Sequence, residues 1–181
     1  MSKKFADILT SFKNISAIRF LILDIDGVMT DGSIVYTSSG EELKSFDVKD
    51  GAGINCWLHA GHGIGIISGR ASPIILRRSG ELGIELVAMA AKDKLPVAEK
   101  MLADAGVTFS ETVAIGDDLP DIPLISRAAL GVAVGDAAAD VKDAARCITN
   151  NSGGRGAVRE TIEAILKAQG LWQNVIARYY Q

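Results

Sequence analysis

Short, unbroken runs of apolar residues recur along the chain, separated by longer segments of mixed character. The run from Phe20 to Leu23 is a clear example, with four apolar residues in succession and no polar alternation. This pattern is typical of a strand that is covered on both faces, as in a parallel sheet flanked by helices. Similar runs predict further strands at 63–68, 85–89, 112–116, 130–134 and 147–149.

The segments between these strands have helical character. Ser72 and Pro73 form a typical helix start, a capping residue followed by proline in the first turn, and Gly106 is a typical stop. Strands that alternate with helices imply a central parallel sheet with helices on both faces. We therefore expect an α/β fold, a Rossmann-like three-layer sandwich. The predicted helices are an amphipathic lead-in at 1–19, then 50–60, one that starts at Ser72, 92–105, 137–145, 156–168 and 171–180.

One segment departs from this alternation. Residues 33–36 and 43–46 are two short strand-like stretches on either side of a turn that contains Gly40. Such an arrangement predicts a β-hairpin. The chain has no internal repeat and no linker, so residues 1–181 are expected to form one domain that carries 33–46 as a hairpin flap.

Composition and charge narrow the class of protein. Of the 181 residues, 48% are hydrophobic and 23% are charged, which suits a globular domain with a sizeable core. The formal net charge is −3 with no basic block, which argues against a nucleic-acid partner. No apolar run approaches the ~20 residues of a membrane span. Cys56 and Cys147 are far apart and lack metal-ligand spacing, so we expect buried thiols in a cytoplasmic protein.

Two acids close the first predicted strand. Asp24 and Asp26 lie two residues apart, so both side chains leave the strand tip in similar directions, and Gly27 lets the backbone turn. Ligands of open α/β sheets bind at this end of the strands. Two adjacent carboxylates need a cation or a shared proton, and Mg²⁺ suits them because it binds carboxylates together with substrate phosphate. Asp-Gly pairs are also common in turns, so this motif alone leaves both a site and a simple turn open.

Three more motifs follow in order. Ser68-Gly69-Arg70 closes a second apolar run, Lys94 lies in a third segment, and the acidic stretch 116–121 closes another run. Together with the first pair of acids, this order resembles the haloacid dehalogenase superfamily of phosphohydrolases. The four motifs of that superfamily are an Asp-x-Asp, a Ser or Thr, a Lys and an acidic cluster.

Further stretches resemble one group within that superfamily, the phosphatases of 3-deoxy-D-manno-octulosonate (KDO) 8-phosphate. These stretches are the hairpin-like segment after Asp31-Gly32, the segment Asp50-Gly51-Ala52-Gly53-Ile54, and residues 153–160. The resemblance implies a Mg²⁺-dependent phosphatase that releases KDO and phosphate on the route to lipopolysaccharide. Two alternatives stay open, a phosphatase for a nine-carbon ulosonate such as KDN or sialic acid 9-phosphate, and a non-catalytic phosphosugar-binding protein.

The resemblance also implies roles for the acids. Asp24 would be the nucleophile that forms an aspartyl-phosphate, and Asp26 the general acid for the departing sugar hydroxyl and then the base for water. Asp24, the backbone carbonyl of Asp26 and Asp117 would hold the Mg²⁺, and Asp118 would support the metal or the lysine. Asp121 is either a direct participant or a helix cap.

The phosphate and the sugar acid need donors and positive charge. By the same resemblance, Ser68 and Lys94 hold the phosphoryl group. Arg70 suits bidentate capture of a carboxylate, although it is otherwise an exposed structural arginine. Two more arginines lie in a glycine-rich loop that opens a helix, where backbone N–H groups favour anions, unless the loop is simply a helix start. The expected substrate-binding residues are therefore Ser68, Gly69, Arg70, Arg155 and Arg159.

Relatives often insert a cap domain, and this chain has no room for one. The interval 26–68 accommodates only the hairpin and one helix, and 94–117 only one helix and one strand. An isolated hairpin is marginally stable in water. With the family resemblance, this predicts a homotetramer in which hairpins cluster and segment 153–181 reaches a neighbour's site. The alternative for the aromatic end of that segment, 172–180, is that it packs on its own domain.

Overall fold

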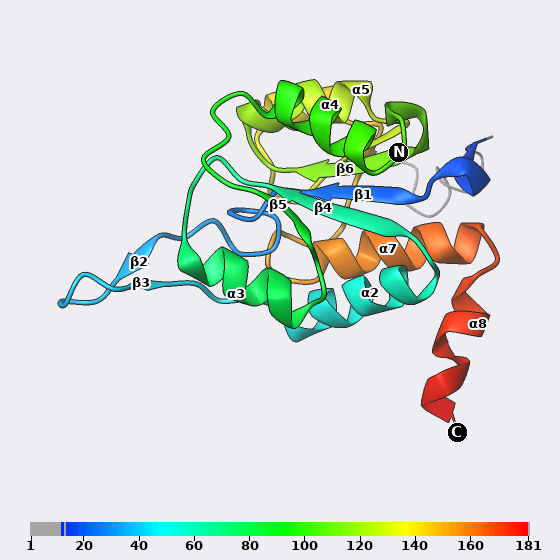
Figure 1. The fold of residues 1–181 in the computed structure, drawn as a ribbon, viewed down its shortest axis with the longest axis horizontal. Coiled ribbons are helices and arrows are strands. Elements are labelled where there is room, and N and C mark those ends of the chain that lie inside the picture. The colour runs from blue at the N-terminus through cyan, green and yellow to red at the C-terminus, as the bar shows by residue number, and fades with distance from the viewer. Residues whose placement is uncertain (1–11, 13, 181) are drawn as a thin grey trace.

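Strand β1 (Phe20–Leu23) occupies the centre of a six-stranded parallel sheet with the order β5-β4-β1-β6-β7-β8. The computed structural model describes residues 12 and 14–180, and Figure 1 shows the sheet between two layers of helices. The predicted Rossmann-like α/β fold is confirmed. The other strands of this sheet are β4 (Gly63–Ile67), β5 (Leu86–Ala88), β6 (Thr112–Gly116), β7 (Leu130–Ala133) and β8 (Cys147–Ile148).

Alternate residues of β1 face the two helical layers. Leu21 and Leu23 belong to the larger apolar core, which includes residues of α2 (Val48–His59) and α7 (Ala157–Ala168). Phe20 and Ile22 belong to the smaller core under α4 (Lys94–Asp104). The period of two explains why an unbroken apolar run is needed here, since both faces of the strand are buried.

Polar residues fix the helix starts close to where the sequence places them. The side chain of Asp47 accepts a hydrogen bond from the N–H of Lys49 at 2.6 Å, so α2 begins at Val48 rather than at residue 50. Ser72 caps α3 (Pro73–Glu81) as predicted. The remaining helices are α5 (Ile122–Arg127), α6 (Ala139–Ala144) and α8 (Trp172–Ile176), and α8 is followed by a 3₁₀ turn at Ala177–Tyr180.

One helix of the structure has no predicted counterpart, and one predicted helix lies mostly outside the described residues. Helix α5 had no counterpart among the predicted helices, because its six residues follow a 3₁₀ turn and are too few for a periodic pattern. The predicted lead-in helix at 1–19 lies mostly outside the described residues, and its described end forms a 3₁₀ turn at Ile15–Ala17.

The hairpin is present with shorter strands than predicted. Strand β2 (Val35–Tyr36) pairs antiparallel with β3 (Glu42–Leu43), and the pair projects from the body of the protein, as Figure 1 shows. In the described chain this hairpin and α2 are the only regular elements between β1 and β4. No helix of the described residues is both long and apolar enough to cross a membrane.

Candidate active site

The loop after β1 turns sharply and places two acids at the carboxyl edge of the sheet. Gly27 has a φ of +95°, a conformation that glycine adopts without steric penalty. A Cβ at this position would lie 2.0 Å from Oδ2 of Asp117 in the loop after β6, so any larger residue would also collide with that side chain. Thr30 tightens the turn, because its hydroxyl accepts from the N–H of Gly27 and donates to the carbonyl of Ile25.

A buried lysine joins two of the acids. Lys94 is the first residue of α4, and its Nζ donates at 2.6 Å to Oδ1 of Asp24 and at 2.6 Å to Oδ1 of Asp121. All three side chains are buried. Burial by itself would lower the pKa of Lys94, but the two carboxylates outweigh it and raise that pKa above its ordinary value.

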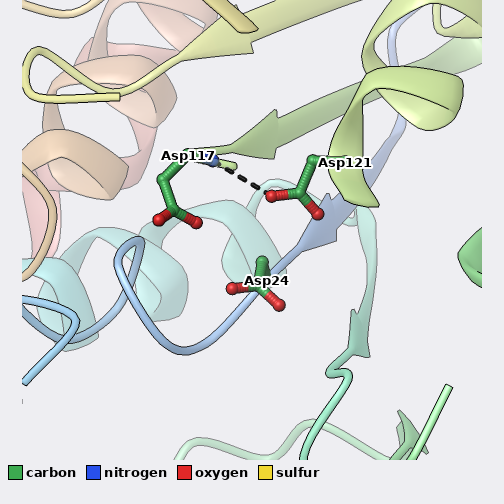
Figure 2. Close-up of side chains that lie close together, drawn as sticks. All are labelled: Asp24, Asp117 and Asp121. Carbon is green, nitrogen blue, oxygen red and sulfur yellow. Dashed lines mark hydrogen bonds between the residues drawn. The ribbon is translucent and has the colours of Figure 1, made fainter. Parts of the chain in front are cut away.

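Asp121 also organises the loop that carries Asp117. Its Oδ2 accepts from the N–H of Asp117 at 3.0 Å and from the N–H of Asp118 at 3.4 Å. Figure 2 shows Asp24, from the segment after β1, close to Asp117 and Asp121, which both come from the segment after β6. The side chain of Asp121 thus holds the lysine with one oxygen and the acidic loop with the other.

These three acids form a cluster with an excess of negative charge. One carboxylate oxygen of each lies within 4.8 Å of those of the other two. Burial raises the pKa of Asp24 to about 6, and burial with the charge of Asp24 raises the pKa of Asp117 to about 7. Lys94 compensates only part of this charge, and the donors are all carboxylate oxygens. Such a set fits a hard divalent cation.

Asp26 has a lysine of its own. Its Oδ1 accepts from Nζ of Lys44, which follows β3 of the hairpin. Its Oδ2 is buried and has no hydrogen-bond partner among the described residues, and Nε of Arg70 lies 3.8 Å away. Lys44 belongs to no motif that distinguishes it from a solvent-exposed lysine of a hairpin, so the sequence alone does not mark it as a site residue.

A cavity of about 510 Å³ opens over these acids. Its walls come from the segments that follow β1, β4, β5 and β6, at the carboxyl edge of the sheet. Ser68 is buried in the wall, where its Oγ accepts from the N–H of Arg70 at 3.2 Å. The predicted site residues that line the cavity are Asp24, Asp26, Ser68, Gly69, Arg70, Lys94, Asp117, Asp118 and Asp121.

Asp118 lies at the rim. It is exposed, and its carboxylate accepts from the N–H of Leu119 at 2.8 Å, which caps the 3₁₀ turn Leu119–Asp121. In the described part of the chain, Lys94 pairs with Asp121 and not with Asp118. Of the two roles that the sequence suggested for Asp118, support of the metal or of the lysine, the contact with the lysine is made by Asp121.

Arg155 and Arg159 do not line this cavity. Arg155 is exposed, with its guanidinium 3.8 Å from the carboxylate of Asp31. Arg159 pairs with Glu163 at 2.9 Å and lies over the ring of Trp172. The two arginines are thus directed to other partners within the same chain.

An internal carboxylate occupies the start of α7. Asp50 of α2 is buried and accepts from the N–H of Gly156 at 3.2 Å and of Arg159 at 2.7 Å. Burial raises its pKa to about 6. The sequence predicts that backbone N–H groups at the start of α7 favour an anionic ligand. In the structure these groups donate to the carboxylate of Asp50 instead.

The glycine-rich loop before α7 instead supports the loop after β1. The N–H of Gly154 donates to the carbonyl of Val28 at 2.9 Å, and Asp136 accepts from the N–H of Gly153 at 2.9 Å. A Cβ on Gly153 would lie 1.7 Å from the carbonyl oxygen of Gly27. The loop after β1 and the loop before α7, which are far apart in the sequence, are thus in direct backbone contact.

Comparison with known proteins agrees with this geometry. Residues 71–162 match the haloacid dehalogenase-like hydrolase family. The 3-deoxy-D-manno-octulosonate 8-phosphate phosphatase KdsC of Haemophilus influenzae is 42% identical over 153 residues, which are 84% of this chain and 85% of that protein. The phosphatase of the same name from Moraxella catarrhalis, in complex with magnesium ion, phosphate ion and KDO, superimposes with a TM-score of 0.90 at 36% identity, covering 96% and 98% of the two chains. The cobalt-bound deoxy-D-mannose-octulosonate 8-phosphate phosphatase of Haemophilus influenzae gives a TM-score of 0.85 at 40% identity, covering 88% and 94%.

Proposed function

We propose, from the premise that this chain belongs to the haloacid dehalogenase-like hydrolase family and is a phosphoric monoester hydrolase, that its substrate is KDO 8-phosphate. The observation that carries this proposal is the cluster of Asp24, Asp117 and Asp121 around Lys94 at the floor of a cavity, in a chain similar over most of its length to phosphatases of that sugar acid. The products would be KDO and phosphate, in the cytoplasmic synthesis of lipopolysaccharide precursors.

The reaction proceeds in two displacements. The carboxylate of Asp24 attacks phosphorus, the bond from phosphorus to the sugar oxygen breaks, and Asp26 gives its proton to that oxygen. Asp26 then takes a proton from water as the water oxygen attacks the aspartyl-phosphate, and the bond between phosphorus and Asp24 breaks. Ser68 and Lys94 hold the phosphoryl oxygens, and each fixed donor of this kind is worth about 10²–10³-fold in rate.

The cation that fits the acidic cluster is Mg²⁺. Asp24, Asp117 and the backbone carbonyl of Asp26 would hold it, and it would offset the charge of the phosphoryl group and the carboxylates. The support for this assignment is the set of hard oxygen donors, since Lys94 is the only cationic side chain among the described residues that forms an ion pair with these three acids.

Assembly would complete the site. The cavity has no inserted domain above it in the described chain, and the hairpin exposes Ile34, Val35, Tyr36 and Leu43, with Tyr36 61% exposed. A ladder of two-residue strands is too short to be stable alone. We propose a homotetramer in which hairpins cover one another and residues of 153–181 reach a neighbouring cavity, since closed symmetry satisfies every copy at once.

Steady-state kinetics on a panel of sugar acid phosphates tests the substrate. KDO 8-phosphate should have the highest kcat/KM, activity should vanish with a chelator, and Mg²⁺ should restore it. A nine-carbon ulosonate 9-phosphate with the higher kcat/KM would replace the substrate proposed here. Phosphate release from none of the esters, in folded and metal-loaded protein, would leave a phosphosugar-binding protein.

Truncation after Ala168 together with light scattering tests the assembly. The truncated chain should lose turnover of the sugar acid phosphate and keep more of its turnover of a small generic ester, because the small ester needs only the central machinery. Equal losses on both esters would show that the tail does not serve recognition. A fully active monomer at the working concentration would refute the tetramer.

A further inference from the structure

Each acid of the Asp-x-Asp motif has a different buried lysine. Lys94 reaches Asp24 from a core helix, and Lys44 reaches Asp26 from the end of the hairpin. The lysine on Asp24 belongs to the motifs that the sequence displays. Lys44, the lysine that contacts Asp26, belongs to none of these motifs.

Lys44 is held in one place by charge. Its side chain is 1% exposed, and its Nζ contacts Oδ1 of Asp26 and lies 3.4 Å from Oε1 of Glu42. Glu42 is held in turn by Arg70, whose guanidinium donates to it at 3.0 Å. An ammonium group as buried as this one is stable only with such partners, so the hairpin delivers a fixed charge to the site.

The pairing divides the two oxygens of Asp26 between two tasks. Oδ1 is bound to Lys44, whereas Oδ2 is buried without a hydrogen-bond partner in the described chain. Nε of Arg70 lies at ion-pair distance from Oδ2, 3.8 Å, and is likewise buried without a hydrogen-bond partner among the described residues. Both atoms belong to residues that line the cavity over the acids. Buried polar atoms of this kind normally have a partner, which points to a polar atom of the ligand between them.

We propose that Lys44 is a positioning residue, which fixes Oδ1 of Asp26 so that Oδ2 carries the proton to the leaving oxygen of the substrate. The inference rests on the proposed phosphatase mechanism, in which the proton passes from Oδ2 to the sugar oxygen as the bond from phosphorus to that oxygen breaks. Water later returns a proton to Oδ2. Lys44 itself transfers no proton in either displacement.

The contact between Lys44 and Asp26 would matter most for esters with a poor leaving group. A sugar alkoxide is a poor leaving group and departs readily only if it is protonated as the bond breaks. A nitrophenolate is a good leaving group and needs little help. A residue that acts only by aligning Asp26 should therefore matter for an alkyl ester and hardly at all for an activated aryl ester. A residue that merely holds the hairpin should affect both esters alike.

The test compares benzyl phosphate with 4-nitrophenyl phosphate, two esters of similar size that differ in leaving group. The measured quantity is kcat/KM with Mg²⁺ present, because it reports the steps up to departure of the leaving group. Lys44→Met should lower kcat/KM about 30-fold or more for benzyl phosphate and less than about 3-fold for 4-nitrophenyl phosphate, since general acid catalysis is worth about 10²–10⁴-fold. Lys44→Arg should recover part of the loss. Lys49→Met, an exposed lysine nearby, should change neither value.

Activity on the aryl ester shows in the same sample that the variant is folded. Equal losses on the two esters, or no loss on benzyl phosphate, would overturn the role of Lys44. Asp26→Asn separates this failure from that of the mechanism, because it should show the same preference for the aryl ester in a stronger form. If Asp26→Asn affects both esters equally, the acid role of Asp26 is wrong and the inference on Lys44 falls with it.

Discussion

Asp121→Ala is the substitution that most directly tests how the acidic floor is held together. The sequence leaves Asp121 as either a direct participant or a helix cap, and in the structure its two oxygens bind the lysine of one segment and the backbone of another. Alanine keeps the backbone and removes both contacts. The effect of this substitution therefore distinguishes a role of Asp121 as a helix cap from a role in the site.

The structure sets the expected size of the effect. Loss of one partner of a buried ion pair costs about 3–5 kcal/mol when the other charge is left unpaired. Here Lys94 keeps Asp24 at 2.6 Å, which reduces that cost, whereas the N–H groups of Asp117 and Asp118 lose an acceptor worth about 1 kcal/mol each. We expect a loss of about 3–4 kcal/mol in the free energy of unfolding, which a typical domain survives. We also expect kcat to fall about 10²-fold, because Lys94 would shift onto Asp24, the proposed nucleophile, and away from the phosphoryl oxygens that it is proposed to hold.

Urea unfolding and steady-state kinetics provide the assay, with Asp104→Ala as the matched control. Asp104 pairs with Lys100 at 2.6 Å, the same distance as in the buried pair, but both side chains are more than half exposed. An exposed pair contributes about 0–1 kcal/mol, so the control should change stability little and kcat not at all. Similar results for the two variants would refute the reasoning that burial makes the Asp121 contacts important.

Three further predictions address other parts of the site. Asp24→Asn should abolish turnover while thermal unfolding remains cooperative, and wild-type activity in a clean preparation would remove Asp24 from its role. Gly153→Ala should destabilise the protein by about 1–3 kcal/mol and weaken Mg²⁺ binding, measured by calorimetry, because the new Cβ pushes on the carbonyl of Gly27; Gly80→Ala, with no atom within 4 Å of its added Cβ, should do neither. Asp50 has a folded-state pKa raised from 3.8 to about 6, so the folded state binds more protons than the unfolded state and stability falls as pH rises through that interval. The stability of wild type minus that of Asp50→Asn should thus drop by about 2 kcal/mol between pH 4.5 and 7, and a difference that is flat with pH would contradict this prediction.

Much of the fold was legible in the sequence because its signals are local. An apolar run such as 20–23 marks a buried strand by itself, and Asp24 and Asp26 at its end mark the edge of the sheet where ligands bind. The order of the strands places the residues after β1, β4 and β6 side by side. For this reason the motif residues at those strand ends converge on one cavity, as the sequence indicated.

The hydrogen-bond and ion-pair partners of those residues could not be predicted from the sequence, because they depend on contacts between distant segments. Lys44 meets Asp26 across 18 positions, Asp121 meets Lys94 across 27, and the carboxylate at the start of α7 comes from a residue 106 positions earlier. No local pattern distinguishes these side chains from an exposed lysine, a helix cap or a surface acid. Their roles follow from burial, which leaves each of them no solvent to pair with.

The two lysines also differ in what fixes them, and this difference has a physical logic. Lys94 stands on a helix that packs into the core, so the half of the site that would bind phosphate is rigid. Lys44 is attached to a hairpin whose ladder is two residues long and whose apolar side chains are exposed. The half of the site that would face the sugar is therefore held by charge pairs and by whatever covers the hairpin.

A phosphoryl group is the same in every phosphate ester, whereas leaving groups vary, so a phosphatase can fix the first half within the fold and adapt the second through a flap. In this view the determinants of phosphate chemistry are sequence motifs, and the determinants of substrate choice are contacts that only the folded chain creates.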